Sequence, residues 1–393
     1  MAYSMYIHIP FCKHRCHYCD FITTVGKERL IDPYVDALTK EIREISQRGE
    51  KYDLHSIYFG GGTPSLLPVS SFEKIINKIH QRFPVKQDCE ISLEANPGTL
   101  SLAYLHQLRK LGFNRLSMGV QSTNPFDLAR LDRIHTVGDV LDSIYEARKA
   151  GFDNLNLDLI FGLPWQNLEN WKNVLIQALS LQPEHFSLYS LIVEPGTELF
   201  SWHQKGLIAL QDQDIEGDMY AFAIKTLADN GYEQYEISNW AKNSPNKDYR
   251  SRHNLQYWRN QSYFGLGLGA HGYIDGFRTE NTPVLDDYIQ RLSSKDHDRG
   301  EFPAAAATIN LIKVEPATQM KDFMMLGLRL VNEGVTCQRF EENYHLSMAS
   351  VFNAEIETLQ KYGLVAWTDK TKSRLRLTKR GVMVANQAFM QFV

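Results

Sequence analysis

The chain has 393 residues, of which 43% are hydrophobic and 22% are charged, and its formal net charge is -4. These values are ordinary for a globular protein with one large core or two unequal ones. The net charge provides no field that would attract DNA or an anionic membrane, so we expect no nucleic-acid partner. The sequence has no signal-peptide pattern at its start and no stretch of roughly 18 uncharged apolar residues. We therefore expect a cytoplasmic protein that is not an integral membrane protein.

The first half of the chain alternates short apolar runs with amphipathic stretches. We predict strands at residues 5–9, 56–59, 90–95, 115–120, 154–161 and 186–193. We predict helices between them, at residues 33–47, 71–83, 101–111, 137–150 and 168–181. This alternation is typical of a parallel sheet with crossover helices. Because six units are fewer than the eight of a closed barrel, we expect an α/β fold built on a partial, open (β/α)6 barrel.

The pattern changes after the sixth predicted strand. A long helix near residues 212–230 leads into a region rich in glycine and aromatic residues, and helical stretches then precede two short strands at 364–367 and 374–377. We expect the barrel over residues 1–230, a connecting region over 231–314 and a small α+β, winged-helix-like domain over 315–393. The last part has no basic helix that would indicate DNA recognition.

Three of the five cysteines lie within eight residues, which in a reducing compartment indicates metal binding or catalysis more than disulfide formation. Cys12, Cys16 and Cys19 have the spacing C-x-x-x-C-x-x-C, in a loop after the first predicted strand. Three thiolates leave one iron of a [4Fe–4S] cluster open. That iron can chelate S-adenosylmethionine (SAM), which electron transfer cleaves to a 5′-deoxyadenosyl radical.

Two other interpretations of the cysteines stay open at this point. A zinc ion would need a fourth ligand, which His14 or His17 could supply, although zinc ribbons usually have a second C-x-x-C pair and this sequence has none. The three cysteines could also be ordinary packed thiols, as we expect for the isolated Cys89 and Cys337. The spacing favours the iron–sulfur cluster.

Polar and glycine-rich segments follow several predicted strands, where ligand sites of such folds gather. The sequence Gly-Gly-Gly-Thr-Pro at residues 60–64 follows the second strand, and glycine permits close approach of the backbone to a ligand. The alternative for this segment is a tight turn before a helix. Carboxylates at strand ends can bind ribose hydroxyls, and Gln or Arg can bind a carboxylate. The candidates on this rim are Glu94, Gln121, Arg133 and Asp158.

The sequence resembles the radical SAM family of oxygen-independent coproporphyrinogen III oxidases and their relatives. The matching strings are YIHIPFC…CxxC, FGGGTPS, EANP, RLSMGVQS, NLDLIFGLP and YSLIVEPGT, in this order over about residues 3–200. The resemblance implies the six-stranded barrel and a [4Fe–4S] cluster on Cys12, Cys16 and Cys19. It also implies SAM contacts from Tyr6, Tyr18, Gly61, Gly62, Thr63, Glu94, Gln121, Arg133 and Asp158.

Within this family, three features favour the HemW-type branch of haem chaperones over the oxidases. The oxidase pattern has a fourth cysteine two residues after the third, where this chain has Phe21. The oxidases also have a longer segment before the cluster, whereas Cys12 lies near the first residue here. Finally, residues 252–258 match the H-N-x-x-Y-W motif that is associated with haem binding in the chaperone branch.

This motif has a chemical interpretation of its own. A neutral imidazole can ligate haem iron, and Tyr and Trp rings offer flat apolar area to a porphyrin. The haem candidates are His253, Asn254, Tyr257 and Trp258. Two alternatives stay open, because His253 and Tyr257 could simply pack at i and i+4 of a helix, and because His271 could be the ligand instead. Leu268 departs from the branch, whose members often have cysteine there.

We therefore expect a haem chaperone that binds a [4Fe–4S] cluster, SAM and haem and delivers haem to acceptor apoproteins. SAM and the cluster would either gate haem transfer or perform a radical step on the porphyrin. The alternative is an oxygen-independent coproporphyrinogen III oxidase of porphyrin biosynthesis. A third interpretation, radical cleavage of haem, is favoured by no feature of the sequence. The C-terminal part could serve docking or homodimerisation.

Overall fold

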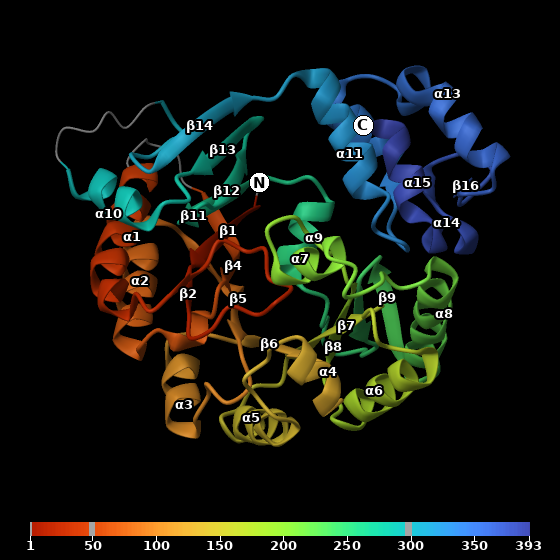
Figure 1. The fold of residues 1–393 in the computed structure, drawn as a ribbon. Coiled ribbons are helices and arrows are strands. Elements are labelled where there is room, and N and C mark those ends of the chain that lie inside the picture. The colour runs from red at the N-terminus through yellow and green to blue at the C-terminus, as the bar shows by residue number, and fades with distance from the viewer. Residues whose placement is uncertain (1, 47–51, 295–300) are drawn as a thin grey trace. The chain divides into compact units, whose positions relative to one another are not determined.

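The computed structural model describes residues 2–46, 52–294 and 301–393. The chain forms two compact units, which Figure 1 colours along the sequence. Unit 1 contains residues 1–216 and 262–312, and unit 2 contains residues 217–261 and 313–393. Gln47, the last residue of the first predicted helix, lies outside the described residues. Within the described ranges, no helix is both long enough and apolar enough to cross a membrane.

Unit 1 is built on six parallel strands that follow one another in chain order across a sheet (Figure 1). They are β1 (Ala2–Ile9), β4 (Asp53–Gly61), β5 (Val85–Ala95), β6 (Arg115–Gln121), β7 (Leu155–Phe161) and β8 (His185–Ser190). The crossover helices are α1 (Ile31–Ser46), α2 (Val69–Arg82), α3 (Leu102–Lys110), α5 (Val137–Lys149) and α6 (Leu168–Ser180). All six predicted strands and all five predicted helices are present, and neighbouring strands pair in parallel. The predicted open (β/α)6 architecture is confirmed.

Residues along these strands alternate between an apolar face and a polar face, because successive side chains of a strand point to opposite sides. On β7, Leu155 and Leu159 are fully buried in the core. Asn156 and Asp158 lie on the other face, where the amide of Asn156 donates to the hydroxyl of Ser117 at 2.7 Å. A parallel sheet with two apolar faces would have continuous apolar strands. The polar face indicates that one side of this sheet is suited to a polar ligand.

Unit 1 continues beyond β1 with four strands that the sequence did not predict. β11 (Tyr263–Gly267) pairs in parallel with β1, and β12 (His271–Ile274) and β13 (Phe277–Asn281) form an antiparallel hairpin next to it. β14 (Thr308–Lys313) lies next to β13 and forms one edge of the sheet. The remaining helices of unit 1 are α4 (Pro125–Arg130), α7 (Glu198–Gln204) and α10 (Leu285–Ser293).

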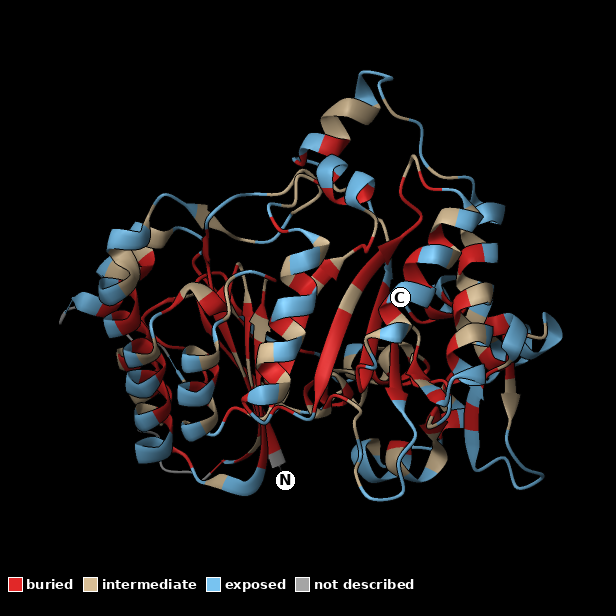
Figure 2. Ribbon diagram, turned by 90° about the horizontal axis from the view of Figure 1, so that it is seen from below, coloured by how far each residue is buried: buried red, intermediate tan, exposed pale blue. Residues whose placement is uncertain are grey.

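Unit 2 begins within α8 (Gln213–Asp229) and continues with an antiparallel pair, β9 (Tyr232–Glu236) and β10 (Asn239–Lys242), and with α9 (Arg252–Trp258). Its C-terminal helices are α11 (Pro316–Gly327), α12 (Cys337–Tyr344), α13 (Met348–Lys361), α14 (Lys379–Met383) and α15 (Ala385–Phe389). They accompany a small antiparallel sheet of order β15 (Val335–Thr336), β17 (Arg374–Leu377) and β16 (Val365–Trp367). The predicted α+β fold of the C-terminal part is confirmed, while unit 2 also includes residues 217–261. Figure 2 shows helices with one buried and one exposed side, as amphipathic helices require.

Candidate functional site

The three cysteines lie at the carboxyl end of β1, in residues 12–19, which we call the cysteine loop. Two short parallel strands, β2 (Phe11–Cys12) and β3 (Thr24–Val25), close its base. The amide of Thr24 donates to the carbonyl of Pro10 at 2.7 Å, and the amide of Cys19 donates to the carbonyl of Cys16 at 3.1 Å. The chain therefore holds the thiols in a short, closed loop at the edge where the parallel strands end.

The cysteine loop also binds the segment after α4. Nε2 of His14 and Nε2 of His17 lie 2.5 and 3.1 Å from the same carboxylate oxygen of Asp132. The amide of His17 donates to the carbonyl of Leu131 at 3.4 Å. Among residues 2–46, 52–294 and 301–393, no group of three or more His, Cys, Asp or Glu side chains is arranged to hold one metal ion. Both histidines therefore contact the carboxylate of Asp132.

The thiols of the cysteine loop interact with one another electrostatically. Burial raises the pKa of Cys12, and it raises the pKa of Cys19 to about 11. The charge of neighbouring thiols in the loop adds to the rise of both pKa values. Three free thiols in one loop match the donor set of a [4Fe–4S] cube, in which each thiolate binds a different iron and the fourth iron stays open. The residues present therefore fit this cluster. When bound, it would supply the electron that cleaves SAM.

Arg133 lies against the cysteine loop. Its Nη1 donates to Sγ of Cys16 at 3.6 Å, and its Nη2 donates to the carbonyl of Gly119 at 2.6 Å. The positive charge of Arg133 lowers the pKa of the Tyr18 hydroxyl, against the larger rise that burial causes. A Cβ atom at Gly119 would lie 3.0 Å from Nε2 of Gln121 and 3.5 Å from Nη2 of Arg133. The structure thus gathers three predicted SAM residues, Tyr18, Gln121 and Arg133, near Cys16.

Gly61 and Gly62, at the end of β4, fit closely against the chain that leads to the cysteine loop. Gly61 has a φ of +115°, and a Cβ atom there would lie within 2.6–2.8 Å of the His8 ring. A Cβ atom at Gly62 would lie 2.8 Å from the carbonyl oxygen of Pro10, and the amide of Gly62 donates to the carbonyl of Ile9 at 2.8 Å. Close backbone packing therefore requires glycine at both positions, in addition to any contact with a ligand.

Glu94 is the centre of a second polar group at the strand ends. Its carboxylate accepts hydrogen bonds from the Tyr58 hydroxyl at 2.8 Å and from the Gly61 amide at 3.0 Å. Burial raises the pKa of Glu94 to about 7; the hydrogen bond from Tyr58 opposes this rise, and the charge of Asp158 adds to it. The ring of Tyr6 stacks on that of Tyr58, with centroids 6.3 Å apart. The predicted residues Tyr6, Glu94 and Asp158 are therefore brought together.

The sequence did not single out three polar residues of these groups, His8, Tyr58 and Asn96. Nε2 of His8 donates to the carbonyl of Ile22 at 2.7 Å, since a carbonyl can only accept, and Nδ1 of His8 therefore accepts from the Tyr6 hydroxyl at 2.9 Å. His8 thereby ties β1 to the chain beyond the cysteine loop. The period-two alternation of β1 could have found His8, because Tyr6 and His8 share one face of that strand.

The predicted haem motif forms α9 in unit 2. The hydroxyl of Ser251 caps this helix by accepting from the amide of Asn254 at 3.2 Å. His253 is 1% exposed, and its Nε2 lies 2.9 Å from the Tyr257 hydroxyl. The two rings meet edge to face, with centroids 4.9 Å apart. This arrangement is the packed helix that the sequence left as an alternative. In it, Nε2 of His253 is not an open ligand for haem iron.

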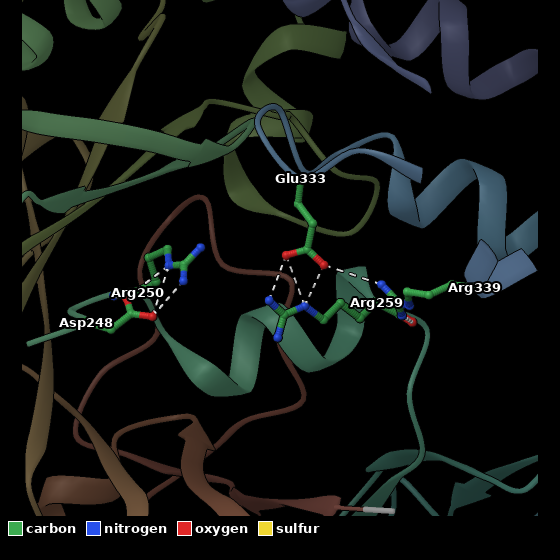
Figure 3. Close-up of polar contacts among 5 residues, drawn as sticks. All are labelled: Asp248, Arg250, Arg259, Glu333 and Arg339. Atoms are coloured by element: carbon green, nitrogen blue, oxygen red, sulfur yellow. Dashed lines mark hydrogen bonds and ion pairs between the residues drawn. The ribbon is translucent and has the colours of Figure 1, made fainter. Parts of the chain in front are cut away.

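Charged side chains of unit 2 hold the C-terminal end of α9 (Figure 3). Arg259 donates to both carboxylate oxygens of Glu333, at distances of 2.7–3.2 Å. Arg339 contacts Glu333 at 3.4 Å and donates to the carbonyl of Arg259 at 3.0 Å. We call these three residues the clasp. The guanidinium of Arg329 lies 4.2 Å from the ring centroid of Trp258. The Trp258 ring therefore already has a cationic partner on one face.

Two further positions bear on the haem prediction. The competing ligand His271 is exposed at the start of β12 in unit 1. Leu268, at the position where the branch often has cysteine, is 2% exposed, and its amide donates to the Tyr34 hydroxyl at 3.1 Å. Leu268 is thus a core residue in this chain.

Residues 6–177 match the model of the radical SAM superfamily, and residues 314–384 match that of the HemN C-terminal domain. The fold and the cysteine loop thus define a protein of the radical SAM superfamily. The chain is 40% identical over 392 residues to the heme chaperone HemW of Bacillus subtilis, covering 99% of both chains, and 34% identical to that of Lactococcus lactis, covering 99% of this chain and 97% of that one. The chain belongs to the HemW family, which confirms the predicted resemblance.

Among solved structures, the fold is similar to that of coproporphyrinogen III oxidase (HemN) from Escherichia coli. The TM-score is 0.82, the sequence identity is 24%, and the match covers 100% of this chain and 90% of that one. At this identity the likeness concerns the fold.

Proposed function

We propose that the chain binds a [4Fe–4S] cluster through Cys12, Cys16 and Cys19, binds SAM at the carboxyl edge of the barrel strands, and carries haem to acceptor proteins. The observation that supports this most is the 40% identity to the heme chaperone HemW of Bacillus subtilis over 99% of both chains. The closed cysteine loop, with Nη1 of Arg133 at 3.6 Å from Sγ of Cys16, supports the cluster part.

For SAM we propose a division of roles among the gathered polar residues. Glu94 and Asp158 are half-buried acceptors whose pKa values are raised, chiefly by desolvation. The positive charge of SAM would favour their ionised forms, and they can accept hydrogen bonds from ammonium and ribose groups. Arg133 and Gln121 can donate to the carboxylate. The full proposed set is Tyr6, Tyr18, Gly61, Gly62, Thr63, Glu94, Gln121, Arg133 and Asp158.

For haem, the cargo, we propose His253, Asn254, Tyr257 and Trp258, with His271 as the competing ligand. In the arrangement described above, the motif does not offer a haem site, because Nε2 of His253 is bonded to the Tyr257 hydroxyl. Ligation by this nitrogen therefore requires that hydrogen bond to be released. His271 requires no such release, since its side chain is exposed.

The experiment that tests the proposal starts with anaerobic reconstitution of the chain with iron and sulfide. The reconstituted protein is titrated with haem, and it is separately incubated with SAM, dithionite and coproporphyrinogen III. Stoichiometric haem binding without a decarboxylated porphyrin product is the expected result. A decarboxylated product formed with matching 5′-deoxyadenosine would instead establish an oxidase and contradict the proposed carrier function.

A further inference from the structure

Asn96 occupies a fixed position at the carboxyl end of β5. It precedes Pro97, and a residue before proline is restricted to extended backbone conformations. Its carbonyl accepts hydrogen bonds from the hydroxyl of Thr99 at 2.6 Å and from the amide of Thr99 at 3.2 Å. The backbone of Asn96 is therefore held in one conformation, and its side chain is presented from a rigid turn.

The side chain of Asn96 connects Arg133 to Thr63. Nη2 of Arg133 donates to Oδ1 of Asn96 at 2.6 Å, and Nδ2 of Asn96 donates to Oγ1 of Thr63 at 3.1 Å. Only this orientation of the amide gives the Arg133 guanidinium an acceptor, because a guanidinium has only donors and must face the amide oxygen. Asn96 therefore accepts a hydrogen bond from the Arg133 cation and donates one to the Thr63 hydroxyl.

The hydroxyl of Thr63 completes this series of hydrogen bonds at a cluster thiol. Its oxygen lies 3.5 Å from Sγ of Cys12. Since the oxygen already accepts from Asn96, its own proton is left to donate to Cys12, and a thiolate can only accept. We call Arg133, Asn96 and Thr63 the donor chain. All its donors point the same way, from a positive charge toward a thiolate, and such hydrogen bonds strengthen one another.

The surroundings keep the donor chain in place. Thr63 is 4% exposed, and its amide donates to the carbonyl of Phe11 at 2.8 Å, next to Cys12. A Cβ atom at Gly119 would lie 3.2 Å from Oδ1 of Asn96, so glycine at this position of β6 leaves room for the amide. Arg133 contacts Cys16 through its other terminal nitrogen. Asn96 thus holds the two side chains that contact two different cluster cysteines.

We propose that Asn96 is a positioning residue that raises the reduction potential of the cluster by aligning Thr63 on Cys12 and Arg133 on Cys16. This inference rests on the proposed cluster on the three cysteines. One-electron reduction adds negative charge that the thiolate sulfurs share, so hydrogen bonds donated to them stabilise the reduced form. The electron comes from an external reductant, and no bond in the chain forms or breaks.

The test is a mediated dithionite titration of the full, anaerobically reconstituted chain, followed by electron paramagnetic resonance. Asn96→Asp keeps an acceptor for Arg133 but removes the donor to Thr63, whose hydroxyl then turns to the new carboxylate. We expect the equilibrium constant for reduction to fall roughly tenfold, which is about 59 mV for a one-electron couple. Thr63→Val, which removes the hydroxyl at nearly constant volume, should lower the potential as well. Thr63→Ser keeps the hydroxyl and should leave the potential unchanged.

Two controls accompany these variants: the first tests a remote added charge, and the second separates the donor chain from the charge added at position 96. Asn124→Asp adds the same charge at the N-cap of α4, where Asn and Asp cap equally well, and should leave the potential unchanged. In the Thr63→Val background, Asn96→Asp should have a smaller effect than in the unaltered chain, because coupled residues are not additive.

The outcomes distinguish this inference from the proposed function. An unaltered chain that takes up no iron and sulfide would contradict the proposed cluster itself. Full iron and sulfide content with equal potentials for Asn96→Asp and the unaltered chain would overturn only the role of Asn96. If Asn96→Asp cannot hold iron, the Thr63 pair decides: equal potentials for Thr63→Val and Thr63→Ser would overturn the inference, and a lower potential for Thr63→Val would support it.

Discussion

The cysteine loop of unit 1 and helix α9 of unit 2 both carry side chains that can bind metals, but these side chains have different partners. Around the cysteine loop, donors come from segments distant in the sequence and end at the thiols, as Arg133 from the segment after α4 does at Cys16. In α9, the metal-binding group and its partner lie one turn apart, since Nε2 of His253 bonds to the Tyr257 hydroxyl. The donors around the cysteine loop stabilise the thiolate form of a cysteine that can bind iron. The hydrogen bond in α9 instead occupies the imidazole nitrogen that would bind iron.

This difference teaches that residue type and spacing do not reveal whether a site is open. A thiol has weak hydrogen-bonding capacity, so three thiols in one loop find no strong mutual partners and stay available for iron. An imidazole and a phenol four residues apart on a helix can satisfy each other. A motif of the first kind therefore indicates a site more reliably than one of the second kind.

The largest expected effect tests the cluster side of the comparison. Cys16→Ala should abolish the brown chromophore and nearly all bound iron and sulfide after reconstitution, because one of three thiolate ligands is lost. Circular dichroism should show that the fold is largely intact. Cys337→Ala, which removes a half-buried thiol of unit 2, is the control and should retain the cluster. Unchanged iron content in Cys16→Ala would refute the assignment.

The two regions should also respond to pH with opposite sign. The pKa of Glu94 is raised to about 7, so folded Glu94 keeps a proton that the unfolded chain has already lost above about pH 4.5. Ionisation of Glu94 therefore lowers the free energy of unfolding as pH rises from about 4.5 to about 7. In the apo-protein, Glu94→Gln should make the decrease in the free energy of unfolding between pH 5 and pH 8 smaller by roughly 2 kcal/mol. Calorimetric unfolding at the two pH values measures this difference.

Glu333 in the clasp should behave in the opposite way. Burial opposes its ionisation, but the hydrogen bonds from Arg259 and the positive charges of Arg259, Arg339 and Arg250 together outweigh burial and hold the pKa of Glu333 below its usual value. Its stabilising contribution is therefore present above its unfolded pKa and is lost as pH falls through its folded pKa. Glu333→Gln should remove this dependence in the same calorimetric unfolding measurement. Glu73→Gln, at an exposed position of α2, is the control for both carboxylates. Equal pH profiles for Glu94→Gln and Glu73→Gln would contradict the prediction for Glu94.

Haem titration of two α9 variants tests whether the hydrogen bond between His253 and Tyr257 limits haem binding. His253→Ala should weaken haem binding severalfold or more and shift the Soret band. Tyr257→Phe frees Nε2 of His253 from a hydrogen bond worth about 1 kcal/mol and should strengthen binding about fivefold. His271→Ala is the matched control. Unaltered spectra in His253→Ala, together with altered spectra in His271→Ala, would move the ligand to the exposed histidine.

The smallest expected effect concerns the clasp. Arg259→Ala removes a partly buried pair with Glu333 and should destabilise the C-terminal end of α9 by about 1 kcal/mol. Faster amide hydrogen exchange in residues 252–258 is the measurement, with the strands of unit 1 as the internal reference. Lys225→Ala, which removes an exposed pair with Asp229 on α8, should leave this exchange unchanged. Equal exchange in both variants would show that the clasp does not hold α9.

The strands of the barrel were predictable because apolar periodicity and polar strand ends mark them directly. The added strands β11 and β12 were not, because glycines interrupt them and resemble turn signals. Gly265 lies within β11, where a Cβ atom would stand 1.9 Å from the carbonyl oxygen of His271. Glycine is thus required by the close approach of two strands, and this approach cannot be recognised before the strands are paired.

The sequence by itself determined the fold class and the set of three cysteines, because both depend on local periodicity and spacing. Only the tertiary structure decided which donors reach the thiols. Arg133 is 117 residues from Cys16 and 37 residues from Asn96, and these side chains meet because parallel strands place their carboxyl ends at one edge. Tertiary structure likewise decided that His253 is buried, since burial depends on what packs over α9.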